Sequence, residues 1–266
     1  MSERNEIAAK PVVHKIPGMD AVKIVRDVPF QSANAQLTMD LYRPPDSSAA
    51  TRLPAVVFVM GYSDLGAEKM FGCKLKEMEA YICWAKLVAA SGLIAVTYVN
   101  HDPMGDLDAL FRHIRENGER LGIDETAIGV WSCSGNVPRA LGLMMQDGRP
   151  ALRCAALCYG CMLDLDGSTN TADGATTWRF TNPTAGKSIR DIPADVPLFI
   201  ARAGRDNPQL NETLDRFVAH ALRANLPITL ANHPNGPHAF DILDDSETSR
   251  EIIRQILAFF RFHLAK

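Results

Sequence analysis

Two kinds of hydrophobic spacing divide the chain. Apolar and polar side chains alternate over residues 21–30 and 36–43, a pattern that predicts two half-buried strands in an antiparallel pair. From residue 55 onwards, short continuous apolar runs alternate with stretches in which apolar residues recur every three or four positions. Buried strands that alternate with amphipathic helices are typical of a mostly parallel sheet flanked by helices. The pattern therefore predicts an α/β fold with an antiparallel N-terminal strand pair.

The second part of the chain supplies most of the predicted elements. Its apolar runs predict strands over residues 55–60, 93–99, 127–131, 152–159, 197–203 and 227–232. Helical spacing predicts helices over most of the intervening stretches and a closing helix through residues 252–260. No linker or repeat interrupts this order, so we predict a single domain over residues 21–266 after a flexible segment, residues 1–20. Residues 161–195 form one long polar stretch, which we expect to be a small lid or pocket loop.

Charge and composition exclude several classes of protein. The 266 residues carry a formal net charge of −3 without a long run of one sign, so we expect no nucleic-acid partner. The apolar runs are too short to span a bilayer, and the N-terminus lacks the apolar region of a secretory signal. We therefore expect a cytoplasmic protein that acts on a small molecule away from membranes. The sequence leaves open whether the protein forms a homodimer.

The six cysteines are expected to be free thiols, as in other proteins of a reducing compartment. Cys158 and Cys161 have the spacing of a metal or redox motif, but there is no second pair and no histidine at ligand spacing. We therefore expect no metal site, and we interpret these residues as part of a buried strand and its exit loop.

The most informative stretch joins a predicted strand to a predicted helix through Ser132-Cys133-Ser134-Gly135-Asn136. In the motif G-x-S-x-G, a sharp turn of this kind lifts a nucleophilic serine clear of the sheet and places it at a helix N-terminus. Here Ser134 is the central residue, while Ser132 and Asn136 replace the two glycines. Asparagine tolerates unusual backbone angles, and we expect the Asn136 side chain to hydrogen-bond a neighbouring loop.

Two alternatives to a serine nucleophile remain at this turn. Ser134 has the residue type of an ordinary helix N-cap. Cys133 is a rival nucleophile, but centring the motif on it would place Trp131 at a position where bulk is excluded.

A serine nucleophile needs a base, and the base needs an acid that orients it. Asp206 follows a predicted strand, and His238 lies in a loop rich in glycine and proline before the closing helix. The carboxyl ends of parallel strands gather at one edge of a sheet. This position favours Asp206 as the acid and His238 as the base. Asp215 could replace Asp206, and His233 could replace His238. Asp206 could also simply cap its loop.

The sequence resembles the α/β-hydrolase superfamily, particularly its dienelactone-hydrolase-like and acetyl-esterase-like branches. The resemblance covers roughly residues 36–264 and rests on MDLYRPP, LPAVVFVMG, LGIDETAIGVWSCSGN, LFIARAGRDNPQLNETLDRFV and GPHAFD. It implies that Ser134, Asp206 and His238 form a catalytic triad. Two backbone N–H groups would form the oxyanion hole, one from Gly135 and one from Tyr62, next to Gly61.

The resemblance implies a serine hydrolase that cleaves a carboxylic ester or a lactone and needs no cofactor. A peptidase or amidase on the same fold is an alternative, and so is a catalytically silent binding protein, which the altered turn favours. Six residues near the expected site are candidates for lining a substrate pocket: Gly61, Phe71, Met104, Trp178, Phe180 and Phe240.

Overall fold

The computed structural model describes residues 3–33, 35–48 and 51–265. Its centre is an eight-stranded sheet in the order β1-β2-β4-β3-β5-β6-β7-β8. The antiparallel pairs are β1 with β2 and β2 with β4, and all later pairings are parallel. The strands are β1 (Lys23–Gln31), β2 (Gln36–Arg43), β3 (Leu53–Phe58), β4 (Ile94–Tyr98), β5 (Ile123–Cys133), β6 (Cys154–Cys158), β7 (Leu198–Ala203) and β8 (Ile228–His233).

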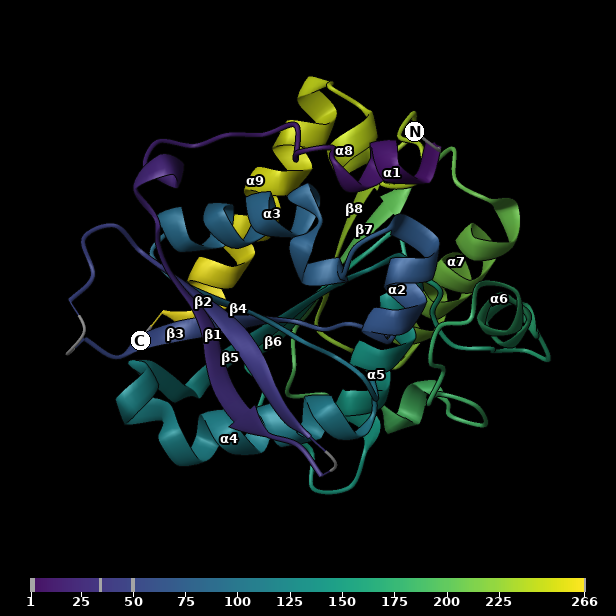
Figure 1. The fold of residues 1–266 in the computed structure, drawn as a ribbon. Helices are drawn as coiled ribbons and strands as arrows, with labels where there is room; N and C mark the ends of the chain where they lie inside the picture. Colours follow the sequence, from purple (N-terminus) through teal and green to yellow (C-terminus); the bar gives the residue numbers. More distant parts are fainter. Residues whose placement is uncertain (1–2, 34, 49–50, 266) are drawn as a thin grey trace.

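Helices cover both faces of this sheet. Figure 1 shows α3 and α9 together over one face, and α4 and α5 over the other. The helices are α1 (Glu3–Ala8), α2 (Asp64–Phe71), α3 (Glu79–Ala90), α4 (Gly105–Leu121), α5 (Val137–Met145), α6 (Asn170–Trp178), α7 (Pro208–Arg223), α8 (Phe240–Leu243) and α9 (Glu247–Leu264). Short 3₁₀ turns η1 (Met19–Ala21), η2 (Leu75–Glu77), η3 (Ser134–Asn136) and η4 (Ile189–Asp191) punctuate the chain.

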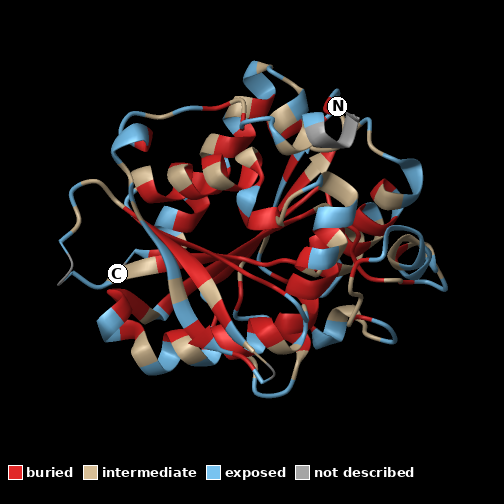
Figure 2. Ribbon diagram, in the orientation of Figure 1, coloured by how far each residue is buried: buried red, intermediate tan, exposed pale blue. Residues whose placement is uncertain are grey.

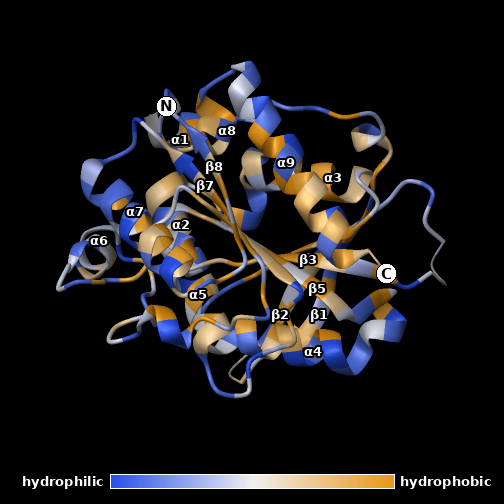
Figure 3. Ribbon diagram, turned by 180° about the vertical axis from the view of Figure 1, so that it is seen from behind, coloured by the Kyte–Doolittle hydropathy of each residue, from blue (hydrophilic) through white to orange (hydrophobic). Residues whose placement is uncertain are grey.

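The hydrophobic core lies along the strands of the sheet. Every residue of β4 and β6 is buried, and Figure 2 shows buried residues concentrated along the sheet in the middle of the molecule. The same strands are mostly hydrophobic when the molecule is seen from behind, whereas the outer surfaces of α4 and α7 are largely hydrophilic (Figure 3). The prediction of a mostly parallel sheet with an antiparallel N-terminal pair is confirmed.

Three segments differ from the sequence-based expectations. Strand β5 begins at Ile123, earlier than predicted, and runs up to Cys133. Helix α2 begins at Asp64, in a stretch to which the sequence pattern assigned no element, and α6 lies inside the polar stretch 161–195.

The segment before β1, expected to be flexible, contributes side chains to the core. Val12 is 2% exposed and Met19 is 8% exposed. The backbone N–H of Val13 donates a hydrogen bond of 2.8 Å to the carbonyl of Asp241. Isolated apolar residues in a polar run give no periodic signal, which explains why the sequence pattern did not reveal this packing.

Candidate active site

Four polar loops meet at the carboxyl edge of the sheet. Ser134 follows β5, Asp206 follows β7, and His238 follows β8. Tyr62 follows β3, the strand paired with β5. Parallel strands bring these loops together although they are far apart in sequence, and such edges are where ligands bind in open α/β sheets.

Ser134 occupies a strained turn. Its φ of 55° lies in the left-handed region, which a residue with a side chain seldom adopts. The flanking Cys133, Gly135 and Asn136 are buried, whereas Ser134 itself is partly exposed. A Cβ atom on Gly135 would lie 2.5 Å from the Tyr62 hydroxyl and 2.7 Å from Phe180 Cδ1, so a side chain there would displace these two rings. The turn therefore presents one hydroxyl to the site while its neighbours pack beneath it.

Ser134, His238 and Asp206 form a continuous hydrogen-bonded chain. Ser134 Oγ lies 2.8 Å from His238 Nε2, and His238 Nδ1 lies 2.7 Å from Asp206 Oδ2. An ionised carboxylate can only accept, so the hydrogen between the last pair belongs to Nδ1. In the neutral imidazole this leaves Nε2 free to accept a hydrogen bond from the serine hydroxyl.

Backbone contacts between two loops hold the acid and the histidine in place. The N–H of Gly204 donates to the carbonyl of His233 (2.8 Å), and the N–H of Arg205 donates to the carbonyl of Gly236 (2.9 Å). The Asp206 side chain is only 4% exposed, and its second oxygen accepts a 2.7 Å hydrogen bond from the N–H of Asn207. The carboxylate is therefore fixed from both sides.

Asn136 ties the turn to the loop after β3, which confirms that it bonds a neighbouring loop. Its Oδ1 accepts a 2.7 Å hydrogen bond from the N–H of Gly61, and its Nδ2 donates to Tyr81 Oη (3.0 Å) and to the carbonyl of Cys133 (3.1 Å). The expected reason for its tolerance was wrong, however. With φ −85° and ψ −19°, Asn136 has ordinary helical backbone angles and needs no special freedom.

The loop after β3 brings its backbone very close to the turn that carries Ser134. A Cβ atom on Gly61 would lie 2.9 Å from the carbonyl oxygen of Gly135 and 3.0 Å from Asn136 Cα, so a side chain there would clash. Asn100 Nδ2 donates a 2.7 Å hydrogen bond to the carbonyl of Tyr62 and helps fix this loop. The Tyr62 N–H makes no hydrogen bond with any described residue.

The alternative site residues have other partners. Cys133 lies in extended backbone with φ −140°, and burial, followed by the nearby Asp241, raises the pKa of its thiol to about 12. Its thiolate is therefore scarce at neutral pH. Asp215 is paired with Arg202 through bonds of 2.7 Å and 3.0 Å. His233 is 3% exposed and is bound to Asp244.

The proposed pocket residues separate into two groups. Phe180 and Tyr62 contact each other edge to face, with centroids 6.2 Å apart, directly beside Gly135. The Thr181 N–H donates a 2.8 Å hydrogen bond to the carbonyl of Gly61, so the segment 161–195 reaches the site. Phe240 is wrong as a lining residue, because it is 1% exposed and packs on other rings.

The remaining three candidates lie elsewhere on the surface or in the packing. Trp178 is 56% exposed at the end of α6, and Met104 is 36% exposed. Phe71 ends α2 and is partly buried against the core.

Two residues near His238 were missed from the sequence. The Tyr159 ring lies edge-on to the His238 imidazole, with centroids 5.1 Å apart. The buried Asp241 accepts hydrogen bonds of 2.7 Å from Tyr159 Oη and from Trp84 Nε1. Burial raises the pKa of Asp241. Tyr159 follows directly after β6, and this position at a strand end is the one signal that could have revealed it.

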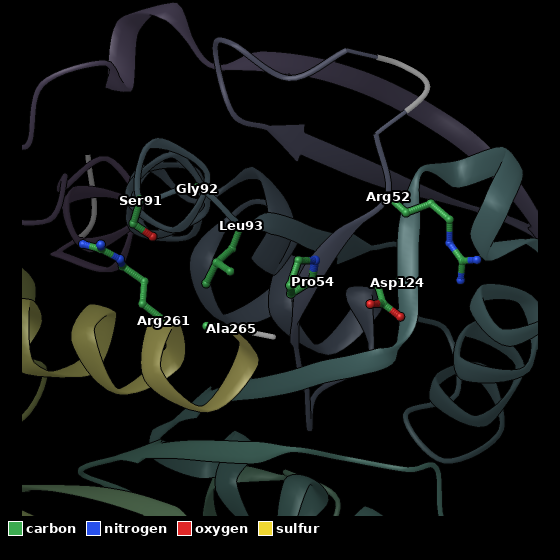
Figure 4. A pocket seen from close by; sticks show the side chains of 8 residues that line it. All are labelled: Arg52, Pro54, Ser91, Gly92, Leu93, Asp124, Arg261 and Ala265. Carbon is green, nitrogen blue, oxygen red and sulfur yellow. The ribbon is translucent and has the colours of Figure 1, made fainter.

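A separate hollow of about 330 Å³ lies at the opposite edge of the sheet, where β3 begins (Figure 4). Its lining residues include Pro54 and Leu93, and those of the triad are absent from it. Within the described ranges, no group of three or more His, Cys, Asp or Glu side chains is placed to hold a metal ion. In the same part of the chain, no helix has the length and apolar character needed to cross a bilayer.

Several solved structures that share this architecture are esterases or α/β-hydrolases with low sequence identity to the chain. A fungal esterase from Rhizomucor miehei matches with a TM-score of 0.72 and 16% identity over 91% of this chain and 85% of its own. A bacterial heroin esterase gives 0.69 and 14%, covering 96% and 88%. An α/β-hydrolase enzyme from the metagenome of Lake Arreo, Spain, gives 0.68 and 18%, covering 97% and 87%. No protein-family model and no curated protein sequence matches the chain. The chain thus has the α/β-hydrolase fold.

Proposed function

We propose that this protein is a serine hydrolase that cleaves a carboxylic ester or lactone through an acyl-enzyme. The observation that carries the proposal is the chain of short hydrogen bonds from Ser134 through His238 to Asp206. The esterase fold neighbours agree with it, as do the dienelactone-hydrolase-like and acetyl-esterase-like motifs. We also propose that the substrate is a small molecule.

In the proposed reaction, His238 Nε2 takes the proton of Ser134 as the serine oxygen attacks the ester carbonyl. The N–H groups of Tyr62 and Gly135 stabilise the negative charge on the carbonyl oxygen. The C–O bond to the leaving alcohol then breaks, and the alcohol takes the proton from His238. Water attacks the acyl-serine with His238 again as base, which releases the acid. Asp206 holds the imidazole tautomer and stabilises its positive charge throughout.

Two features support an active enzyme over a silent binding protein. Ser134 keeps the strained φ of 55°, and such strain persists only where the surrounding structure maintains it. Asn136 has ordinary backbone angles and makes three hydrogen bonds. An asparagine in place of the motif's glycine therefore does not distort the turn. Phe180 and Tyr62 give the site an aromatic wall that suits an apolar acyl or aryl group.

The proposal is tested by labelling the purified protein with a fluorophosphonate, which reacts with activated serines. Wild-type protein should be labelled at Ser134 and should hydrolyse short aryl and acetyl esters. Ser134→Ala should lose both properties without unfolding. Cys133→Ala is the matched control, because it changes the adjacent residue and should keep most of the activity. An unlabelled wild type, or a labelled Ser134→Ala with an inactive Cys133→Ala, would overturn the assignment.

The same assay separates ester hydrolysis from the alternative reaction. A panel of aryl esters, lactones and anilides of matched acyl groups should give turnover for esters or lactones and little for anilides. Faster cleavage of the anilides would instead identify an amidase.

A further inference from the structure

Tyr159 lies beside the base and next to a residue that packs on the nucleophile turn. Its ring is edge-on to the His238 imidazole, with centroids 5.1 Å apart and an interplanar angle of 70°. A Cβ atom built on the following residue, Gly160, would lie 2.2 Å from Val137 Cγ2 and 3.0 Å from the carbonyl oxygen of Ser134. The two residues after β6 therefore contact both the base and the turn that carries Ser134.

Tyr159 is fixed both at its backbone and at its hydroxyl. It is buried, and its φ of 37° lies in the left-handed region, which a bulky residue rarely adopts. Its N–H donates a 2.7 Å hydrogen bond to the carbonyl of Ala201, and its Oη donates a 2.7 Å hydrogen bond to Asp241 Oδ1. Backbone strain of this kind persists only where the surrounding structure fixes the residue. The ring beside His238 is therefore rigidly placed.

The acceptor of this hydroxyl belongs to the same segment as the base. Asp241 comes three residues after His238 in the chain. Its side chain is buried, and its other carboxylate oxygen accepts a 2.7 Å hydrogen bond from Trp84 Nε1. The Tyr159–Asp241 bond therefore ties the end of β6 to the segment that carries His238.

The imidazole of His238 needs a further support when the serine is acylated. In the free enzyme, Ser134 Oγ and Asp206 Oδ2 each meet one ring nitrogen. In the proposed acyl-enzyme the serine oxygen has no proton to donate, so the bond to Asp206 alone remains from this chain, on a side chain that is 41% exposed. One hydrogen bond lets the ring swing, whereas a general base must keep its nitrogen within about 3 Å of the proton that it removes.

We propose that Tyr159 is a positioning residue, whose rigid ring holds the His238 imidazole in place during acylation and deacylation. This inference deepens the proposed function and rests on it. The ring contact does not depend on the serine proton, so it persists when the serine is acylated. Tyr159 adds no chemical step, because its hydroxyl stays bonded to Asp241.

Two substitutions of Tyr159 separate positioning from stability. Tyr159→Leu removes the ring, so kcat/KM for 4-nitrophenyl acetate and the rate of fluorophosphonate labelling should both fall by about 10–10²-fold, as for a misplaced catalytic group. Tyr159→Phe keeps the ring but loses the bond to Asp241. It should melt at a lower temperature than the wild type and yet keep both rates within a few-fold.

Phe199→Leu is the matched control. It removes a buried ring from β7, the strand next to β6, where that ring packs on Phe259 with centroids 5.5 Å apart. The variant should melt at a lower temperature, as Tyr159→Leu should, but both rates should stay within a few-fold of the wild type.

Proton NMR reports on the imidazole without relying on turnover. The Nδ1 proton between His238 and Asp206 should give a low-field resonance that is absent from His238→Ala. In Tyr159→Leu this resonance should be lost through exchange with solvent, because a swinging ring breaks its bond to Asp206 more often. In Tyr159→Phe and Phe199→Leu the resonance should remain.

The outcomes separate this inference from the proposed function. If Tyr159→Leu keeps the wild-type rates, or if Tyr159→Phe loses as much rate as Tyr159→Leu, the ring does not position the base and the inference is overturned. An equal loss of rate in Phe199→Leu overturns it as well, because the effect would then follow stability. A wild type that neither hydrolyses esters nor reacts with a fluorophosphonate refutes the proposed function. Even in that case, a low-field resonance that persists in Tyr159→Leu overturns the positioning role by itself.

Discussion

Two histidine–aspartate pairs lie at the ends of one loop and have almost the same geometry. His238 Nδ1 is 2.7 Å from Asp206 Oδ2, and His233 Nε2 is 2.8 Å from Asp244 Oδ2. Their surroundings differ. The His238 side chain is 41% exposed, and its other nitrogen meets the Ser134 hydroxyl. The His233 side chain is 4% exposed, and its Nδ1 is buried without a partner among the described residues.

The contrast shows that a short bond to a carboxylate does not make a histidine a base. A general base needs a second nitrogen that reaches the proton to be removed. His233 lacks that access, because its second nitrogen, Nδ1, is buried and has no partner among the described residues. Ser246 and Ser249 both contact the nitrogen that meets Asp244. His233 joins β8 to the start of α9, while the more exposed His238 keeps its second nitrogen against the Ser134 hydroxyl.

Replacing each histidine by alanine should give opposite results. His238→Ala should lower kcat by about 10⁵–10⁶-fold, as expected when the base of a triad is lost, with little effect on thermal stability. His233→Ala should leave kcat of the folded protein within a few-fold of the wild type but destabilise it by about 1–3 kcal/mol, because buried partners lose a hydrogen bond. Ester kinetics and urea unfolding measure the two effects. Loss of kcat in a folded His233→Ala would break the contrast.

The carboxylates of Asp206 and Asp244 can be compared by replacing each with the isosteric asparagine. Asp206→Asn should lower kcat about 10³–10⁴-fold, because an amide does not hold the imidazole in the tautomer that accepts the serine proton. Asp244→Asn should leave kcat nearly unchanged and lower the melting temperature. Equal kinetic losses in the two variants would show that both pairs serve catalysis.

The acid side of the stability profile should depend on Asp244. Hydrogen bonds from Ser246, and then from Ser249 and His233, hold the pKa of Asp244 below its ordinary value. Its folded-state pKa is thus lower than its unfolded one, so its stabilisation is present above the unfolded pKa and is lost as pH falls through the folded pKa. Below about pH 4, urea unfolding should show a steeper loss of stability in the wild type than in Asp244→Asn. If stability falls equally with pH in the two proteins, the His233–Asp244 pair contributes nothing to the stability of the fold.

The fold was largely predictable because buried strands leave a continuous apolar signal. Helices α2 and α6 were not, for a physical reason. Helix α6 buries only Thr171, so it has no apolar stripe to detect. Helix α2 is short and depends on its cap, in which Ser63 Oγ accepts a hydrogen bond from the N–H of Gly66. Such helices are set by local caps and tertiary contacts rather than by periodicity.

For the site, the sequence placed Ser134, Asp206 and His238 at strand ends, and the structure brings these three together. It could not separate Asp206 from Asp215 or His238 from His233 by spacing alone, since those choices depend on how the loops curve. Phe240 was misjudged because an aromatic residue beside a catalytic loop can pack beneath it as easily as line the pocket.

The hydrogen bonds on both sides of Gly61, in the loop after β3, have a consequence for engineering new substrate ranges. Gly61 is held on one side by the Asn136 amide and on the other by the Thr181 N–H. Substrate-selecting inserts are attractive units to exchange between relatives, because they are long and lie at the surface. Here an exchanged insert must also present an N–H where Thr181 now does. On the proposed function, selectivity and rate would therefore be coupled through this loop, and libraries that vary 161–195 should keep residues 180–182 fixed.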